Sequence, residues 1–380
     1  MNFPALLRCS MCDWSSAIGA LRNLCPACNA PVVVRYDIQP DPELRARIRC
    51  RARGMWRWSE VLPPVPPAEV VTLGEGDTPL LAAPRLGRAL GMTNLLVKDE
   101  SLNPTRSFKA RGMAAAVTMA RRLGAERLAA PTAGNAGSAL AAYGARAGLP
   151  IFIAMPDDTP SSMIDECRSY GAEVELVRGV ITDAGRRVQE VLRERGGFDL
   201  STLKEPYRVE GKKTMAYELV EQLGGVPDAI LYPTGGGTGL IGMWKAFAEM
   251  EQLGWIGSER PRMFSIQSRG CAPIVRAFEQ GLDTAPEWEH PRTAAWGLRV
   301  PRAVGDRLML AALRASGGGA VAVPEETIEP AAAEIREREG IDAGPEGGAA
   351  LAGLRILLER AALPRDAQVV LFNTGANKYR

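Results

Sequence analysis

The 380-residue sequence contains a single histidine, His290, and this scarcity excludes several familiar kinds of catalytic site. A Ser-His-Asp or Cys-His centre would have to depend on that one residue, and no G-x-S-x-G motif is present. A catalytic metal site with three histidine ligands is impossible. If the protein is an enzyme, its chemistry must come from other side chains or from a cofactor.

The sequence also lacks a strong charge bias and a long apolar segment. Its 46 basic and 44 acidic side chains leave a formal net charge of +2, which provides no bulk attraction to nucleic acid or to an anionic membrane. No stretch approaches the roughly 18 apolar residues that indicate a membrane-spanning helix, and no signal-peptide pattern begins the chain. We therefore expect a cytoplasmic protein that binds neither nucleic acid nor membrane.

Four of the seven cysteines are clustered near the N-terminus as two C-x-x-C pairs, namely Cys9, Cys12, Cys25 and Cys28. Each pair presents two thiolates on one tight turn, and together the pairs can bind one tetrahedral zinc ion. Two disulfides or unliganded thiols are the alternatives, and the missing secretion signal disfavours disulfides. Because four thiolates leave no open coordination position, the sequence predicts a structural zinc site.

After a proline-rich connector at residues 60–69, short apolar segments alternate with amphipathic ones. Runs such as "NLLVKDE", "PIFIAMP" and "QVVLFNTG" predict buried strands, and longer runs such as "SFKARGMAAAVTMARRLG" predict helices. Continuous apolar strands that alternate with helices are typical of parallel sheets covered on both faces. The predicted fold class is α/β.

Ligands of such folds bind in the turns that follow the carboxyl ends of strands. One of these turns is very rich in glycine and reads "PTGGGTGLIG", with Gly235, Gly236, Gly237, Thr238 and Gly239 at its centre. Consecutive glycines before a helix let backbone N–H groups converge on an anion, although a simple tight turn is the alternative. There is no Gly-Lys-Ser/Thr of a nucleotide-triphosphate loop.

The same turn satisfies the G-x-G-x-x-G pattern of dinucleotide sites, through Gly237, Gly239 and Gly242. That pattern also needs an acidic residue near the end of the next strand, where this sequence has Gln267 and Ser268. A single phosphate monoester therefore fits the turn better than a dinucleotide.

Two further turns and one lysine complete the set of candidate site residues. In "PTAGNAGSALAAYG", Thr132, Asn135 and the amides of residues 133–137 could hold a carboxylate, or form an ordinary turn. In "LFNTGANKYR", a strand ends at the hydroxyl of Thr374, and Lys109 begins a helix after "SF". Pyridoxal phosphate needs an amine for its Schiff base, an anion site and a partner for its pyridine nitrogen, so this combination suggests that cofactor.

The order of these motifs resembles a known family. "LGEGDTPL", "NPTRSFKARG", "PTAGNAGSALAAYGARAG", "EPYRVEGKKT", "GGGTG" and "NTG" are similar to motifs of threonine synthases, in the tryptophan-synthase-β-like, fold type II group of pyridoxal-phosphate enzymes. The resemblance implies two doubly wound sheets. It places a large cofactor-binding domain at residues 65–106 and 210–380, a smaller mobile domain at 107–209, and a zinc-ribbon-like segment at 1–40.

The resemblance also implies a role for each candidate residue. Lys109 would carry the cofactor as a Schiff base beside Phe108, Asn135 would bond the phenolic oxygen, and Thr374 would face the pyridine nitrogen. Residues 235–239 would hold the cofactor phosphate. Arg208 would bind the phosphate of the substrate, whose carboxylate would lie against Thr132, Ala133, Gly134, Asn135, Ala136 and Gly137.

The implied reaction converts O-phosphohomoserine and water to threonine and phosphate, in a protein expected to be a homodimer that binds a phosphorylated amino acid. One alternative is a β-eliminating or β-replacing enzyme acting on serine, threonine or phosphoserine, of the ammonia-lyase or cysteate-synthase kind. Another is a catalytically inert relative that only binds ligand.

Two positions differ from the family's usual "NPTGSFKDRG", since Arg106 replaces its glycine and Ala110 its aspartate. The C-terminal "TGANKYR" also differs from the usual ending. We expect Arg106 to contribute to substrate selection, unless it faces solvent or pairs with a carboxylate such as Glu100. These departures bear on the substrate more than on the fold or the cofactor.

Overall fold

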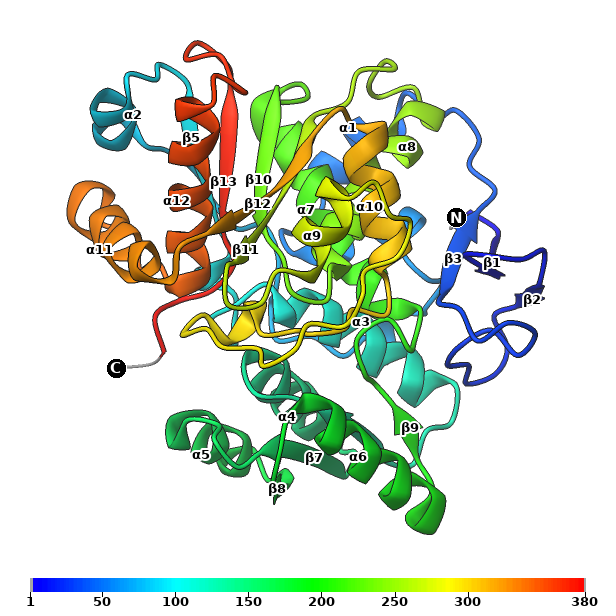
Figure 1. Ribbon diagram of the computed structural model, residues 1–380. Coiled ribbons are helices and arrows are strands. Elements are labelled where there is room, and N and C mark those ends of the chain that lie inside the picture. The colour runs from blue at the N-terminus through cyan, green and yellow to red at the C-terminus, as the bar shows by residue number, and fades with distance from the viewer. Residues whose placement is uncertain (1–2, 379–380) are drawn as a thin grey trace.

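Two parallel sheets form the centre of the structure, and Figure 1 shows the larger one above the smaller one. The computed structural model describes residues 3–378. The larger sheet has six strands in the order β12-β11-β10-β13-β5-β4, and only β4 is antiparallel to its neighbour. Their bounds are Gly319–Val323, Arg262–Ser268, Ala229–Pro233, Val369–Asn373, Leu95–Asp99 and Leu80–Ala82.

Helices cover both faces of the larger sheet. On one face lie α2 (Pro84–Leu90), α11 (Ile328–Glu339) and α12 (Pro345–Glu359). On the other lie α7 (Tyr207–Leu223), α8 (Thr238–Gln252), α9 (Pro273–Glu279) and α10 (Asp306–Ala315). Neighbouring residues of β10 point to opposite faces, so Leu231 packs in the cluster that contains α11 and α12, and Ile230 packs in the other cluster. Burial on both faces explains why these strands are apolar throughout.

The smaller sheet has four parallel strands in the order β8-β7-β6-β9, with bounds Glu173–Val177, Ile151–Pro156, Leu128–Pro131 and Phe198–Asp199. Helix α6 (Ile181–Arg195) packs on one face, and α4 (Asn135–Ala147) and α5 (Ser161–Ser169) pack on the other. Helix α3 (Lys109–Arg122) contacts both α4 and α7 and so joins the two sheets. The mobility expected of residues 107–209 stays a prediction.

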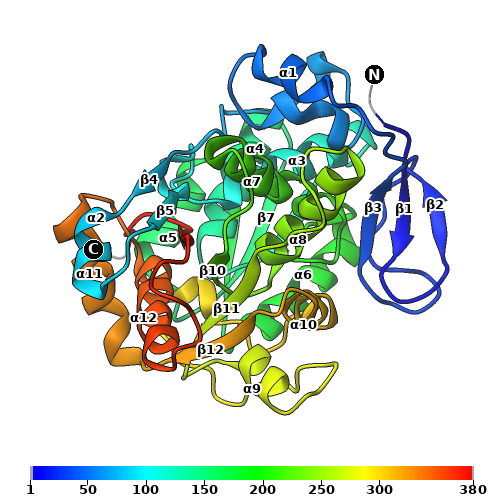
Figure 2. The same ribbon diagram turned by 90° about the horizontal axis from the view of Figure 1, so that it is seen from above.

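A third, antiparallel sheet is built from β1 (Ala5–Cys9), β2 (Ser15–Ala17) and β3 (Val32–Tyr36), in the order β2-β1-β3. Figure 2 shows it at the edge of the molecule, and its strand β3 contacts α7. Helix α1 (Leu44–Arg49) follows it. The α/β fold class predicted from the sequence is confirmed. None of the helices within residues 3–378 has the length and apolar character needed to span a membrane.

Candidate active site

A cavity opens where the carboxyl ends of strands from both sheets meet. The larger sheet contributes the ends of β10 and β13, and the smaller sheet those of β6 and β7. Helices α3, α4 and α8 begin at this cavity, so three positive helix ends face the same space and favour an anionic ligand. Most of the predicted site residues line it, namely Phe108, Lys109, Thr132, Ala133, Gly134, Asn135, Ala136, Arg208, Gly235, Gly236, Gly237, Thr238, Gly239 and Thr374.

Lys109 is the first residue of α3, and its amine lies inside the protein at the cavity wall. Its Nζ is 4.0 Å from the centre of the Phe108 ring. Burial, and then the charge of Arg208, lower the pKa of Lys109 to about 7, although the carboxylate of Glu346 acts in the opposite direction. At neutral pH a large fraction of this amine is therefore unprotonated and able to act as a nucleophile or a base.

The glycine turn before α8 cannot accommodate a side chain at Gly235, Gly237 or Gly239. A Cβ on Gly235 would lie 2.1 Å from the carbonyl oxygen of Gly297, and one on Gly239 would lie 2.0 Å from the hydroxyl of Tyr232. Gly237 has a φ of 78°, in the left-handed region that favours glycine. The turn runs directly into α8, whose first amides have no acceptor within the helix. This geometry leaves backbone donors free for an anion.

A lysine that the sequence analysis left unassigned stands beside this turn. The Nζ of Lys212 donates a hydrogen bond of 2.5 Å to the hydroxyl of Thr238, and the side chain is fully buried. Burial, followed by the charges of Arg208 and Lys109, holds the pKa of Lys212 well below its usual range. An anion bound at the turn would relieve this repulsion, because it would pair with Lys212.

Arg208 lies on the first turn of α7 and is only 2% exposed. Its Nη1 donates to the carbonyl oxygen of Leu200 at 2.8 Å, while its buried Nε has no hydrogen-bond acceptor. Within residues 3–378, no carboxylate forms an ion pair with it. The nearby Glu205 instead accepts from the backbone of Tyr207 at 2.7 Å, and burial raises the pKa of Glu205 to about 7. A buried guanidinium without an ion pair is costly unless an anionic ligand binds it.

The turn before α4 supplies further polar groups. The hydroxyl of Thr132 accepts from the amide of Gly134 at 3.2 Å, and the Oδ1 of Asn135 is buried without a partner. The amide of Phe108 donates to the carbonyl oxygen of Thr374 at 3.0 Å, which ties the start of α3 to the end of β13. Lys109, Asn135 and Thr374 therefore surround one space, although they are far apart in the sequence.

Two predicted residues lie outside the cavity wall. Gly137 is buried, and a Cβ there would lie 2.6 Å from the Cγ2 of Thr132, so this glycine allows close packing. The Nη2 of Arg106 lies 2.7 Å from the Oδ2 of Asp342, in an ion pair whose side chains are 55% and 47% exposed. Arg106 therefore pairs with a carboxylate, which is one of the two alternatives stated above, and it does not line the cavity.

The backbone explains why the family usually has glycine at this position. Arg106 has a φ of 54°, which a glycine adopts without strain. Its side chain pairs with Asp342 and not with Glu100, whose carboxylate lies 2.7 Å from the Nε of the buried Arg111.

Several cavity residues were missed by the sequence analysis. The segment 296–301 covers the glycine turn, and the amide of Gly297 donates to the Oε1 of Glu346 at 2.7 Å. No motif marked this segment or Glu346. Glu205 and Lys212, in contrast, belong to "EPYRVEGKKT", and their place in that motif could have drawn attention to them.

Comparison with known proteins agrees with this geometry. The family profile "Pyridoxal-phosphate dependent enzyme" matches residues 71–375. The chain belongs to this family. It is 35% identical to the threonine synthase of Methanocaldococcus jannaschii, over 97% of this chain and 92% of the relative.

Solved structures show the same architecture. A pyridoxal 5'-phosphate-dependent aspartate racemase superposes with a TM-score of 0.68, 22% identity, and coverage of 79% of this chain and 90% of that chain. A fungal L-serine ammonia-lyase from Rhizomucor miehei gives a TM-score of 0.67 and 24% identity over 80% and 94% of the two chains. The fold type II architecture implied by the resemblance is confirmed.

The cavity fits pyridoxal phosphate. The family uses a lysine amine to hold this cofactor and an anion site to hold its phosphate, and Lys109 and the glycine turn provide both on one cavity. Among the described residues the buried Oδ1 of Asn135 has no partner, and the crowding around Gly235 and Gly239 excludes a side chain at these two positions.

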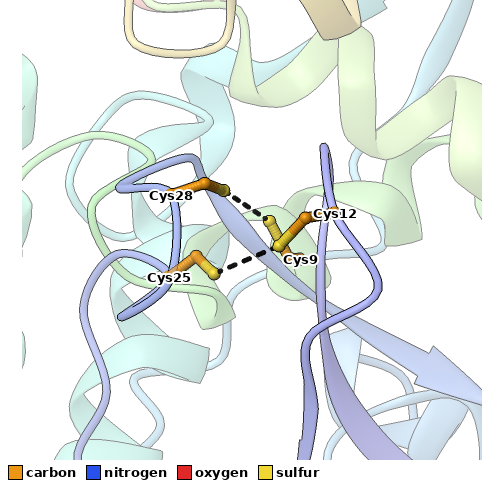
Figure 3. A group of neighbouring side chains, drawn as sticks. All are labelled: Cys9, Cys12, Cys25 and Cys28. Carbon is orange, nitrogen blue, oxygen red and sulfur yellow. Dashed lines mark hydrogen bonds between the residues drawn. The ribbon is translucent and has the colours of Figure 1, made fainter.

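The four clustered cysteines converge at the base of the N-terminal sheet. Their Sγ atoms all lie within 4.8 Å of one another. In Figure 3, Cys9 faces Cys28 and Cys12 faces Cys25. The two Sγ–Sγ distances are 3.4 Å and 3.7 Å. In a tetrahedral site with zinc–sulfur bonds of roughly 2.3 Å, the sulfurs stand roughly 3.8 Å apart. The cluster therefore has the size and the donor set of a four-thiolate zinc site.

Proposed function

We propose that this chain is a threonine synthase, a lyase that uses pyridoxal phosphate to convert O-phosphohomoserine and water to threonine and phosphate. The curated relatives that match most of its length carry that name. The observation that carries the proposal is Arg208 beside Lys109, a buried cation that forms no ion pair with any of the residues 3–378. The cofactor phosphate has a site of its own at the glycine turn, so Arg208 is available for a second anion, the phosphate of the substrate.

In this proposal, residues of three helix N-termini hold the cofactor. Lys109 would hold it covalently, and Gly235 to Gly239, with Lys212 beside them, would bind its phosphate. Asn135 would bond its phenolic oxygen, and Thr374 would serve as the partner of its pyridine nitrogen. When bound, pyridoxal phosphate supplies the electron sink that stabilises negative charge at the substrate's Cα. The neutral hydroxyl of Thr374 suits the fold type II group of enzymes, because a carboxylate in its place would hold the pyridine nitrogen of the cofactor protonated.

The other residues bind the substrate and move its protons. The amides of residues 133–137 bind the α-carboxylate at the positive end of α4. The amine of Lys109, with its pKa lowered to about 7, accepts the proton from the substrate's Cα. It is also placed to return a proton to a carbon atom of the substrate later in the reaction. Arg208 binds the γ-phosphate through its guanidinium. The segment 296–301 limits the entry of water until the phosphate has left.

The direct test is to measure phosphate release from a small panel of amino acids. O-phosphohomoserine should yield equal amounts of phosphate and threonine, whereas phosphoserine, serine and threonine should react far more slowly. Formation of a 2-oxo acid and ammonia from the β-substituted substrates, with no turnover of O-phosphohomoserine, would establish the β-eliminase alternative instead.

The lowered pKa of Lys109 leads to a prediction about cofactor uptake. Only an unprotonated amine attacks an aldehyde, so the rate at which cofactor-free protein binds pyridoxal phosphate should rise between about pH 6 and 8 and then level off. An ordinary lysine, with a pKa of about 10.4, would give a rate that still rises above pH 9.

The measurement is the growth of cofactor absorbance after mixing, with Nα-acetyl-lysine as the control. Glu205 also has a pKa of about 7. The Glu205→Gln variant removes this second titrating group, so its rate profile reports the titration of Lys109. A rate that climbs steadily to pH 10 in both proteins would contradict the assignment.

We also propose that Cys9, Cys12, Cys25 and Cys28 bind one structural zinc ion, which closes the zinc-ribbon-like segment. None of the four cysteines is among the described residues that line the cavity, and four thiolates leave no coordination position for chemistry. A cytoplasmic location and a homodimeric state stay predictions.

Replacing Cys9 and Cys28 together by serine should remove the zinc and lower the midpoint of thermal unfolding by about 5 °C or more. The folded fraction should keep the absorbance spectrum of the bound cofactor. Cys50→Ser is the matched control, because Cys50 is an exposed free thiol outside the cluster. If tag-free protein contained no zinc and had four readily titrated thiols, the zinc site would be ruled out.

A further inference from the structure

In the loop between the two cysteine pairs, the side chain of Asn23 hydrogen-bonds to the main body of the protein. Its Nδ2 donates to the carbonyl oxygen of Asp199 at 2.8 Å and to that of Lys204 at 2.9 Å. These two residues are the ends of a turn, which is closed internally by a bond of 3.1 Å from the amide of Lys204 to Ser201. Asn23 therefore joins both ends of the turn 199–204.

That turn supports the anion side of the cavity. The carbonyl oxygen of Leu200 accepts from the Nη1 of Arg208, the one hydrogen bond that orients this guanidinium among the described residues. Thr202 lines the cavity and packs on the glycine turn, since a Cβ on Gly236 would lie 2.6 Å from its Cγ2. A shift of the turn would move Leu200 and so redirect Arg208.

A second contact comes from the N-terminal sheet and reaches the first turn of α7, which carries Arg208. The hydroxyl of Tyr36, the last residue of β3, donates to the Oε2 of Glu210 at 2.7 Å. Glu210 is two residues after Arg208 and is fully buried, where it pairs with Lys213 at 2.7 Å. The ring of Tyr36 also lies 4.0 Å from the Nζ of Lys213. The first turn of α7 is therefore held from the N-terminal sheet independently of Asn23.

We propose that the N-terminal cysteine segment positions Arg208 for anion binding, through the contacts of Asn23 with the turn 199–204 and of Tyr36 with Glu210. The inference rests on the proposed function insofar as Arg208 binds the substrate phosphate. Asn23 and Tyr36 are positioning residues, because neither lines the cavity. Their effect is on affinity for the anion and not on the proton transfers at Lys109.

The test uses the intact, cofactor-loaded protein and inorganic phosphate as the probe. Phosphate binding is followed by the change in cofactor absorbance and by competitive inhibition of turnover. Asn23→Asp keeps the size of the side chain but places a carboxylate oxygen against two carbonyl oxygens. Phosphate should then bind roughly fivefold more weakly or worse, as expected for the loss of one or two hydrogen bonds.

The kinetic constants distinguish a displacement of Arg208 from a general loss of structure. In Asn23→Asp, KM for the phosphorylated substrate should rise by a similar factor, while kcat changes by less than about twofold. Tyr36→Phe removes only the hydroxyl and should shift phosphate affinity in the same direction, by roughly threefold. Asn29→Asp is the matched control, because it adds the same charge to the same segment at an exposed residue.

A double-mutant cycle assigns the effect to Arg208. In an Arg208→Gln background, Asn23→Asp should weaken phosphate binding little further, since the residue that it positions has been removed. Unchanged phosphate affinity in both Asn23→Asp and Tyr36→Phe would overturn the inference, as would fully additive losses in the cycle. Absence of Arg208-dependent phosphate binding in the unmodified protein would instead overturn the proposed role of Arg208 itself.

Discussion

Replacement of Lys109 by alanine should abolish turnover, with a loss of about 10⁴-fold or more. The amine is proposed both to hold the cofactor and to move the proton at Cα, and no other group on the cavity wall is placed to do either. Lys212 is nearby, but its Nζ is engaged with the hydroxyl of Thr238. The measurement is the rate of phosphate release, together with the cofactor absorbance of the purified variant.

Two further experiments make this result specific. Borohydride reduction of the unmodified protein, followed by peptide mapping, should place the pyridoxyl label on Lys109. Label on Lys98, Lys212 or Lys213 would refute the assignment. Because Lys109→Ala leaves space beside Phe108, a small amine such as methylamine should restore part of the activity. Absence of any rescue in a well-folded, cofactor-loaded variant would indicate that the loss has another cause.

The residues that sequence reasoning identified share one property, which is that their role is local. Gly235 to Gly239 are needed because a side chain would collide with neighbours, and that requirement is visible as a run of glycines. The two C-x-x-C pairs can also be recognised locally, since each places its two thiolates on one turn. Apolar strands followed by such turns also indicate the α/β fold, because parallel sheets are buried on both faces.

The residues that were missed act across long sequence separations. Glu346 is near Lys109 only because α12 and α3 begin at the same cavity, and no spacing in the sequence reveals this. The contact of Asn23 with Lys204 spans 181 positions. The segment 296–301 covers the glycine turn without any regular pattern of its own. Packing of the two sheets decides these contacts, and a single sequence does not contain that information in readable form.

Arg106 and Arg208 show how a local pattern can mislead. Both stand in motifs that flank the site, and the sequence analysis assigned both to the substrate. The structure separates them by burial: Arg106 is exposed and paired with Asp342, while Arg208 is buried and has no ion pair among residues 3–378. The departure from glycine at position 106 therefore bears on a surface turn and not on the pocket.

Arg208→Gln should make the enzyme lose its preference for phosphorylated substrates. The change removes the charge and keeps a polar side chain beside Leu200, so the fold of the buried turn is preserved better than with alanine. In the proposed complex, Arg208 and the substrate phosphate form a buried, hydrogen-bonded charge pair. Removing one member of such a pair costs about 2 kcal/mol or more, so kcat/KM for O-phosphohomoserine should fall by roughly thirtyfold or more. For unphosphorylated amino acids, kcat/KM should fall much less. Their binding does not use the guanidinium, and the loss of its effect on the pKa of Lys109 acts on both kinds of substrate alike.

Arg106→Gly is the matched control for this experiment. It also removes one arginine near the start of α3, but from an exposed ion pair whose contribution is about 0–1 kcal/mol. Glycine also relieves the left-handed backbone at this position, so the variant should fold and retain its ratio of kcat/KM values between phosphorylated and unphosphorylated substrates. If Arg106→Gly altered that ratio while Arg208→Gln did not, the two arginines would have to exchange roles. If neither changed it, phosphate selection by Arg208 would be wrong, and the β-eliminase alternative would become the better account of the site.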